Sequence, residues 1–201
     1  MLLDDPLGGL PDAAARAPAL RRALRELGLT VLHATRDPAV AFALSDRVAV
    51  MEAGRVRQVG TPRALYDAPA DAVVAALSGE ANLLPGTVSS RDDDSCVLRL
   101  DGGLEAIGQP VGDLAPGARA ILLIRPEDVA VAALSAEEMG EDAVPAVLLD
   151  AAFAGAEARL RLRLEDGTEI LARRPAHLPL PQPGGEAAVA WDAGTARVLP
   201  E

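Results

Sequence analysis

Apolar residues between positions 12 and 28 recur at the spacing of a helix. Leu20, Leu24 and Leu27 follow one another at intervals of four and three, and the neighbouring arginines lie off that stripe. Asp12 precedes the pattern and Gly28 follows it, and these residue types commonly begin and end helices. We therefore expect one amphipathic helix here, capped by Asp12 and ended by Gly28.

The rest of the first 78 residues alternates β-like and helical segments. The first residues, MLL, and the run LTVLHAT are apolar and short, as expected of buried strands. DPAVAFALSD and TPRALYD each begin with a capping residue followed by proline, Asp37-Pro38 and Thr61-Pro62, which predicts two short helices. RVAVMEAGRVRQVG has the pattern of a hairpin turning at Glu52-Ala53-Gly54. This order of elements is typical of the end of an α/β domain rather than of a whole one.

From about Gly79 the pattern changes to short apolar runs separated by turn residues. The runs are CVLRL, ARAILLI, DVAVA, ARLRLRL, TEILA, EAAVAW and ARVLP. Such runs predict an all-β domain. The chain therefore divides into an α/β part over residues 1–78 and an all-β part over residues 79–201.

The all-β part repeats itself. VLRLDGG at residues 97–103 is followed by LAPGARAILLIRPEDVAV, and LRLEDG at residues 162–167 is followed by PQPGGEAAVAWDAGTARV. Turn residues and apolar runs match in order between the two stretches. We expect two copies of one β-unit, each closing on itself as a small barrel.

Composition narrows the functional classes. Half of the 201 residues are apolar (50%) but only 2% are aromatic, so Ala, Val and Leu must fill the core. The net charge of −11 argues against a nucleic-acid or anionic-membrane partner. Cys96 is the single cysteine, which excludes an internal disulfide and favours a reducing compartment. No apolar run is long enough to span a bilayer and charge follows Met1 closely, so we expect a cytoplasmic chain without membrane insertion.

Four stretches resemble the ATP-binding-cassette (ABC) ATPases of import systems. LLDDPLGGLPD is similar to their LLLDEPLSALD segment, which holds the Walker B strand and the D-loop. TVLHATRDPAVAFALSDRVAVMEAGRVRQVGTPRALYDAPAD is similar to the segment that follows it there. GEANLLPG and IRPEDV resemble the transport-associated OB-type (TOBE) domain of importers for polyamines, iron and sugars. The resemblance covers essentially the whole chain. It implies the carboxyl-terminal remnant of a P-loop ATPase domain followed by a two-unit OB-like β-barrel domain.

The resemblance also implies roles for three residues. Asp4 matches the aspartate that holds magnesium on the nucleotide phosphates. Asp5 stands where the family has the glutamate that polarises the attacking water, and its side chain is one methylene shorter. Arg36 stands where the family has a histidine at the γ-phosphate, and an arginine cannot act as a neutral hydrogen-bond relay. Asp5 and Arg36 are therefore expected to be degenerate catalytic positions, with ATP and magnesium as the cofactors of the family.

Other parts of a nucleotide site have no match in the sequence. All 19 basic residues are arginine, so the lysine of a phosphate-binding P-loop is absent. The LSGGQ signature is also missing. We expect a truncated, degenerate ATP-binding subunit of an importer of small solutes, without its first half and without ATPase activity of its own.

Two other interpretations remain open. The β-part could act as a non-enzymatic regulatory or small-ligand-binding OB-type module, since some relatives of this domain bind small oxyanions and Arg173-Arg174 could do so here. Alternatively, the chain is an incomplete gene product whose P-loop half is encoded just upstream. The expected protein partners are a second copy in a homodimer, an intact ATPase subunit, and the membrane subunits of a transporter.

The remaining conspicuous residues receive structural interpretations. His33 is predicted to be a core histidine, and the run Asp92–Asp94 a solvated turn rather than a calcium loop. Arg173-Arg174 is most simply a solvated strand end. Arg125 is expected to be structural, and Trp191 to anchor the core of the last β-unit.

Overall fold

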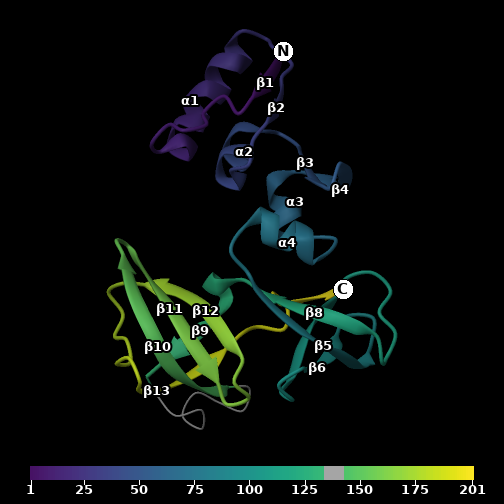
Figure 1. Cartoon of the computed structure of the whole chain (residues 1–201), viewed down its shortest axis with the longest axis vertical. Helices are drawn as coiled ribbons and strands as arrows, with labels where there is room; N and C mark the ends of the chain where they lie inside the picture. Colours follow the sequence, from purple (N-terminus) through teal and green to yellow (C-terminus); the bar gives the residue numbers. More distant parts are fainter. Residues whose placement is uncertain (134–142) are drawn as a thin grey trace. The chain divides into compact units, whose positions relative to one another are not determined.

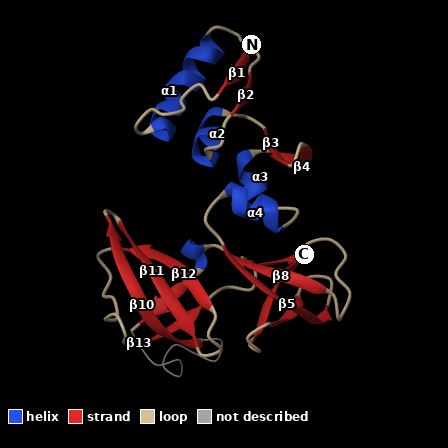
Figure 2. Cartoon of the chain, in the orientation of Figure 1, coloured by secondary structure: helices blue, strands red, loops and turns tan. Residues whose placement is uncertain are grey.

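The computed structural model describes residues 1–133 and 143–201 and divides the chain into two compact units. Unit 1 comprises Met1–Gly79 and unit 2 comprises Glu80–Glu201 (Figure 1). Helices belong to unit 1 except for one short 3-10 turn, and unit 2 is otherwise built from strands (Figure 2). The all-β character predicted for the second part is therefore confirmed.

Unit 1 begins with two short parallel strands that are joined by a helix. Strand β1 and strand β2 pair in parallel, and α1 forms the connection between them. An antiparallel hairpin and three further short helices complete the unit. The elements are β1 (Leu2–Asp4), α1 (Ala13–Glu26), β2 (Leu32–Ala34), α2 (Pro38–Leu44), β3 (Val48–Glu52), β4 (Arg55–Gly60), α3 (Pro62–Asp67) and α4 (Ala72–Ser78).

Capping side chains set most of the helix starts in unit 1. Asp37 accepts hydrogen bonds from the backbone N–H groups of Ala39 and Val40 at 2.8 and 3.3 Å, and Thr61 caps α3 in the same way. The helix predicted after Asp12 is confirmed, but the cap is wrong: Asp12 has a left-handed backbone (φ 55°) and its side chain makes no capping bond. Gly28 ends the helix with a φ of 65°, as predicted.

Unit 2 contains a closed five-stranded barrel and a second five-stranded sheet. The barrel strands are β5 (Asn82–Arg91), β6 (Cys96–Leu100), β7 (Glu105–Pro110), β8 (Arg119–Ile124) and β14 (Arg197–Pro200). The sheet strands are β9 (Ala130–Ala132), β10 (Val144–Ala154), β11 (Glu157–Leu164), β12 (Glu169–Pro175) and β13 (Glu186–Ala190). The 3-10 turn η1 (Pro126–Asp128) connects β8 to β9.

The two halves of unit 2 have the same strand order but exchange their last strands. The barrel runs β7-β6-β5-β8-β14, and the sheet runs β12-β11-β10-β13-β9. Strand β9 follows the first set along the chain yet pairs with β13, while β14 follows the second set yet pairs with β8 and β7. The prediction that each repeat closes on itself is therefore wrong, because each fifth strand completes the other repeat.

The sheet also differs from the barrel in its closure. Strand β14 pairs with both β7 and β8, which closes the barrel. The corresponding strands β9 and β12 form no ladder, and the Arg174 Nη1 group instead donates a hydrogen bond to the Val131 carbonyl at 2.8 Å. One side chain thus joins the two edges of the sheet.

One continuous core joins the barrel and the sheet. Inward-facing leucines of both halves belong to the same buried cluster, including Leu98 and Leu122 of the barrel and Leu160 and Leu162 of the sheet. In β5, Gly86 is required by close packing, since a Cβ there would lie 2.5 Å from the Arg99 carbonyl oxygen. Unit 2 therefore packs as a single body.

Candidate functional site

The carboxyl end of β1 delivers the two adjacent aspartates predicted from the sequence. Strand pairing places Asp4 opposite Ala34, and the Asp5 N–H donates to the Ala34 carbonyl at 2.7 Å. The Thr35 hydroxyl donates to Asp5 Oδ1 at 3.0 Å. The structure therefore brings Asp5 and Thr35 together at the ends of two neighbouring parallel strands, as expected for this edge of a sheet.

The Asp5 carboxylate is held in place by the turn that follows it. Asp5 has a left-handed backbone (φ 42°), which is uncommon outside glycine. Gly8 lies so close that a Cβ there would overlap the Asp5 carboxylate group. Glycine at this position and the Thr35 hydroxyl together fix the orientation of Asp5.

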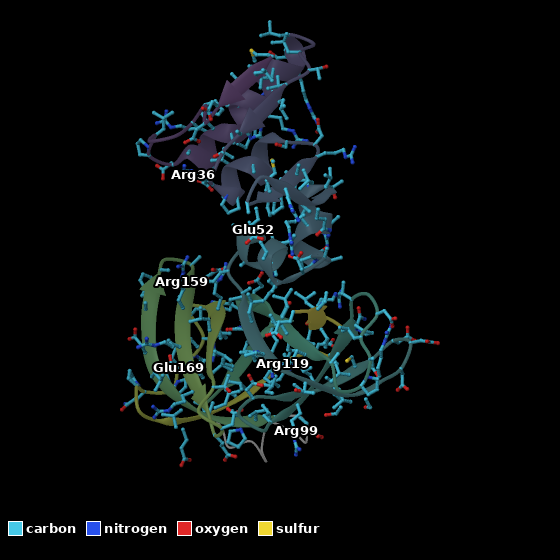
Figure 3. The ribbon with its side chains drawn as sticks, turned by 45° about the vertical axis from the view of Figure 1, so that its right-hand side comes forward. Arg36, Glu52, Arg99, Arg119, Arg159 and Glu169 are labelled. Atoms are coloured by element: carbon cyan, nitrogen blue, oxygen red, sulfur yellow. The ribbon has the colours of Figure 1, made fainter. Side chains whose placement is uncertain are left out.

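Asp4 and Arg36 are placed differently from Asp5. Asp4 is exposed and lines a hollow of about 990 Å³ in unit 1, whose other lining side chains are largely apolar. Arg36 is exposed on the surface of unit 1 (Figure 3) and has no hydrogen bond or ion pair to any residue that the structure describes. Its neighbour Asp37 is occupied in capping α2. The predicted site residues are therefore not assembled into one cluster.

The described residues of unit 1 offer few clustered donor groups around Asp4. Within residues 1–133 and 143–201, no group of three or more His, Cys, Asp or Glu side chains is arranged to hold a metal ion. Asp5, the carboxylate nearest to Asp4 in sequence, accepts the Thr35 hydroxyl. The chain offers no lysine for the outer phosphates.

His33 lies on β2, where it pairs with Leu3 of β1. It is half-buried, and desolvation by burial lowers the pKa of its imidazole. Its Nε2 atom is buried without a hydrogen-bond partner among the described residues. His33 therefore behaves as a packed side chain of unit 1.

A polar cluster in unit 2 fixes the first residues that follow Gly79. The side-chain amide of Asn82, which is only 5% exposed, donates to the Leu171 carbonyl at 2.9 Å and accepts from the Leu171 N–H at 2.7 Å. The buried Arg125 donates to the Glu80 carbonyl at 3.2 Å. Asn82 thus replaces a strand partner for β12. No pattern in the sequence singled it out.

Arg173 belongs to the same cluster. Its guanidinium pairs with the carboxylates of Glu80 and Glu127 at 3.4 and 3.6 Å. Arg174 donates to the Val131 carbonyl. The interpretation of Arg173-Arg174 as a solvated strand end is therefore wrong: both side chains join elements within unit 2, which leaves neither arranged as a free anion site.

Unit 2 also has an acidic groove that sequence analysis missed. The groove has a volume of about 910 Å³ and is lined by the two repeated turns, around Gly102 and Asp166, and by the partly buried Trp191. Among the described residues, the charged ones that line it are acidic: Glu105, Glu165, Asp166 and Asp192. The repeated Leu–acid–Gly turns were the only signal in the sequence that could have indicated it.

No helix within the described part of the chain is long and apolar enough to cross a membrane.

Comparison with known proteins finds a family model that matches part of unit 2 and relatives that are similar over both units. The TOBE domain family matches residues 122–199. The chain is 35% identical over 99% of its length to the spermidine/putrescine import ATP-binding protein PotA of Rubrobacter xylanophilus, of which it covers 53%. The corresponding protein of Ruegeria pomeroyi is 38% identical over 87% of the chain, which covers 46% of that protein. The chain thus spans about half the length of the curated relatives that it matches.

One solved structure shares the fold of a large part of the chain. The cytoplasmic molybdate-binding protein ModG superposes with a TM-score of 0.52 at 19% identity, covering 60% of this chain and 96% of ModG. At this identity the likeness shows the fold alone. It supports the OB-like interpretation of the β-units.

Proposed function

We propose that this chain is the carboxyl-terminal part of an ABC import ATP-binding subunit with its TOBE domain, and that it serves in the import of a small solute. The observation that carries the proposal is the similarity at 35% identity over 99% of the chain, which includes both units. The relatives are named for spermidine and putrescine, so a small organic polycation is the proposed class of transported solute.

In this proposal Asp4, Asp5 and Arg36 occupy the positions of the family's site residues, but Asp5 and Arg36 differ from the residue types found there. Asp4 is the proposed magnesium position of the family. Asp5 is the proposed position of the general base, and its exposed carboxylate accepts a hydrogen bond from Thr35. Arg36 is the proposed position of the phosphate-sensing histidine, and it is exposed and unattached. These 201 residues on their own are therefore proposed neither to bind ATP tightly nor to hydrolyse it.

The remaining role is association. Unit 1 is the proposed remnant of the ATPase domain, and unit 2 is the proposed regulatory TOBE domain. The proposed partners are a second copy, an intact ATPase subunit and the membrane subunits of the importer, at the cytoplasmic face of the membrane. A free-standing ligand-binding module is less well supported, because the relatives match unit 1 as well as unit 2.

The test is co-purification of this chain with the tagged full-length Rubrobacter relative. We expect a complex, and we expect the purified chain alone to show no magnesium-dependent ATP turnover. Asp5→Glu combined with Arg36→His should remain inactive, because these changes supply no phosphate-binding lysine. Turnover above background in either protein would contradict the inactive role, and failure to bind the full-length relative would contradict the import role.

A further inference from the structure

The acidic groove of unit 2 is built from both repeats. The first repeat contributes the turn at residues 100–103 and strand β7, and the second contributes the turn at residues 164–167 and the segment after β13. The two turns touch, since a Cβ on Gly102 would lie 2.3 Å from Asp166 Oδ2. The groove therefore belongs to the rigid meeting point of the repeats within unit 2.

The two turns have the same backbone but differ in charge. In residues 100–103 and 164–167, the last glycine donates its N–H to the carbonyl of the first leucine, at 2.8 and 3.0 Å. In the first turn, Asp101 accepts two hydrogen bonds from Arg119, of 2.6 and 3.0 Å. Glu165 stands at the same place in the second turn and forms no ion pair with a residue that the structure describes. The second turn thus lacks the arginine that balances the first.

The other carboxylates of the acidic groove are also without a cation among the described residues. Asp166 accepts the Thr168 N–H at 2.9 Å, and Asp192 accepts the Gly194 N–H at 2.7 Å. The Oδ2 atom of Asp166 is buried and has no hydrogen-bond partner in the described part of the chain. The groove therefore holds negative charge that unit 2 does not balance there.

Apolar side chains line the acidic groove between its carboxylates. They include Leu104, Ile107, Val144, Pro145 and Trp191. Ile107 is 46% exposed and the indole of Trp191 is partly buried. A ligand that fits this lining needs apolar groups as well as positive charge. Arginine side chains pair with carboxylates and stack on aromatic faces, so they suit a groove that offers both.

We infer that the acidic groove docks a basic cytoplasmic segment of the importer's membrane subunit. This inference rests on the proposed function, which makes that subunit a partner. Cytoplasmic segments of membrane proteins carry an excess of lysine and arginine, which complements the charge of the groove. A second copy of unit 2 fits less well, because it holds 21 acidic and only ten basic residues. A small polycation would supply charge but no side chains for Ile107 and Trp191.

The experiment uses Trp191, the single tryptophan of the chain, as the reporter. The full chain is titrated with synthetic peptides that copy the cytoplasmic segments of the membrane subunit from the importer of the Rubrobacter relative. We expect a basic peptide to change the fluorescence of Trp191. The same peptide with glutamine in place of lysine and arginine should not do so. Binding should weaken as salt is added, because the groove is open to solvent.

Two double variants locate the bound peptide. Glu105→Gln with Glu165→Gln removes two charges from the groove and should weaken binding by about tenfold. Glu157→Gln with Glu169→Gln is the matched control, since both residues are exposed, form no ion pair with a described residue and do not line the groove. The control should bind the peptide like the unchanged chain.

Several results would overturn the inference. They are the absence of a response to every peptide, equal binding by the two double variants, and equal binding of the basic and glutamine peptides. Tighter binding of spermidine than of any peptide would assign the groove to a small solute instead. If the full-length relative co-purifies with the chain while no peptide binds, the docking surface is rejected and the proposed function stands. Failure of that co-purification would reject the proposed function, and with it the partner named here.

Discussion

Leucines of the same size lie in opposite environments in the two units. Leu160 on β11 is 1% exposed, whereas Leu32 on β2 is 70% exposed. Among the described residues, most exposed large apolar side chains belong to unit 1, and unit 2 contributes only Ile107, Phe153 and Leu178. Unit 2 covers its own core, while unit 1 leaves more apolar side chains exposed.

The two units also differ in net charge. Unit 1 holds nine acidic and nine basic residues, whereas unit 2 holds 21 acidic and ten basic residues. The whole net charge of −11 therefore belongs to unit 2. Excess charge keeps a folded surface dispersed in solution. Unit 1, which has no net charge, therefore lacks the charge repulsion of unit 2.

The largest expected difference between the units is in protease resistance. Limited proteolysis of the full chain should remove unit 1 first and leave a carboxyl-terminal fragment that begins near Gly79. The reason is that local opening is easiest where few apolar side chains are buried. Mass spectrometry of the time course identifies the fragment. If residues 1–79 form the resistant fragment instead, unit 1 is the more stable of the two units.

The next largest effect comes from a matched pair of leucine truncations. Leu122→Ala on β8 removes a fully buried side chain and should destabilise unit 2 by about 2–5 kcal/mol. Leu32→Ala removes a side chain that is 70% exposed and should change stability by less than about 0.5 kcal/mol. Urea unfolding followed by circular dichroism measures both. Similar losses in the two variants would show that Leu32 is covered in solution.

Two side chains that bridge backbone groups give a smaller contrast. Asn82→Ala leaves the Leu171 N–H and carbonyl without their partner in a buried place and should cost about 1–3 kcal/mol. Gln58→Ala is the control in unit 1, where that amide bridges Ala68 and Ala70 nearer to solvent. Its cost should be lower, since water can replace the lost bonds. Thermal unfolding of each variant measures the two losses of stability. Equal losses would contradict the expected difference between the buried and the exposed bridge.

The smallest expected effect is a dependence on pH that is confined to unit 1. Burial lowers the pKa of His33, so the unfolded chain takes up its proton before the folded unit does. Stability should therefore decrease as the pH falls through about 6.5 and below. His33→Gln should remove this dependence. Hydrogen exchange of unit 1 between pH 7.5 and 5.5 measures it, and an unchanged profile in the variant would assign the dependence to other groups.

Local sequence signals predicted much of unit 1. Asp37 and Thr61 cap helices as expected, and the hairpin turns at Ala53-Gly54, where both residues have positive φ. The strand predicted from LTVLHAT forms only at Leu32–Ala34, since β1 offers just three residues for pairing. Local patterns succeeded where the partner of each element lies close in sequence.

Long-range pairing explains the errors in unit 2. The run DVAVA was assigned to the first repeat and ARVLP to the second, and each pairs with the other repeat. Nothing in a strand's own residues identifies which of two similar sheets it joins. Asn82 was missed for the same reason, because its partner Leu171 lies 89 residues away. The carboxylates Asp4 and Asp5 were found because they follow a strand, but their different neighbours depend on the turn at Gly8.

The exchange of β9 and β14 has a consequence for how the protein is made. Synthesis proceeds from the amino terminus, so β5 to β8 leave the ribosome long before Arg197–Pro200 exist. The barrel cannot close during that time, and its open edge must wait for the final strand, whose Val198 is fully buried. Pairings between distant segments are slow to form and leave strand edges exposed meanwhile. A nascent chain stalled before Arg197 would therefore hold an unclosed barrel whose strand edges are accessible to chaperones.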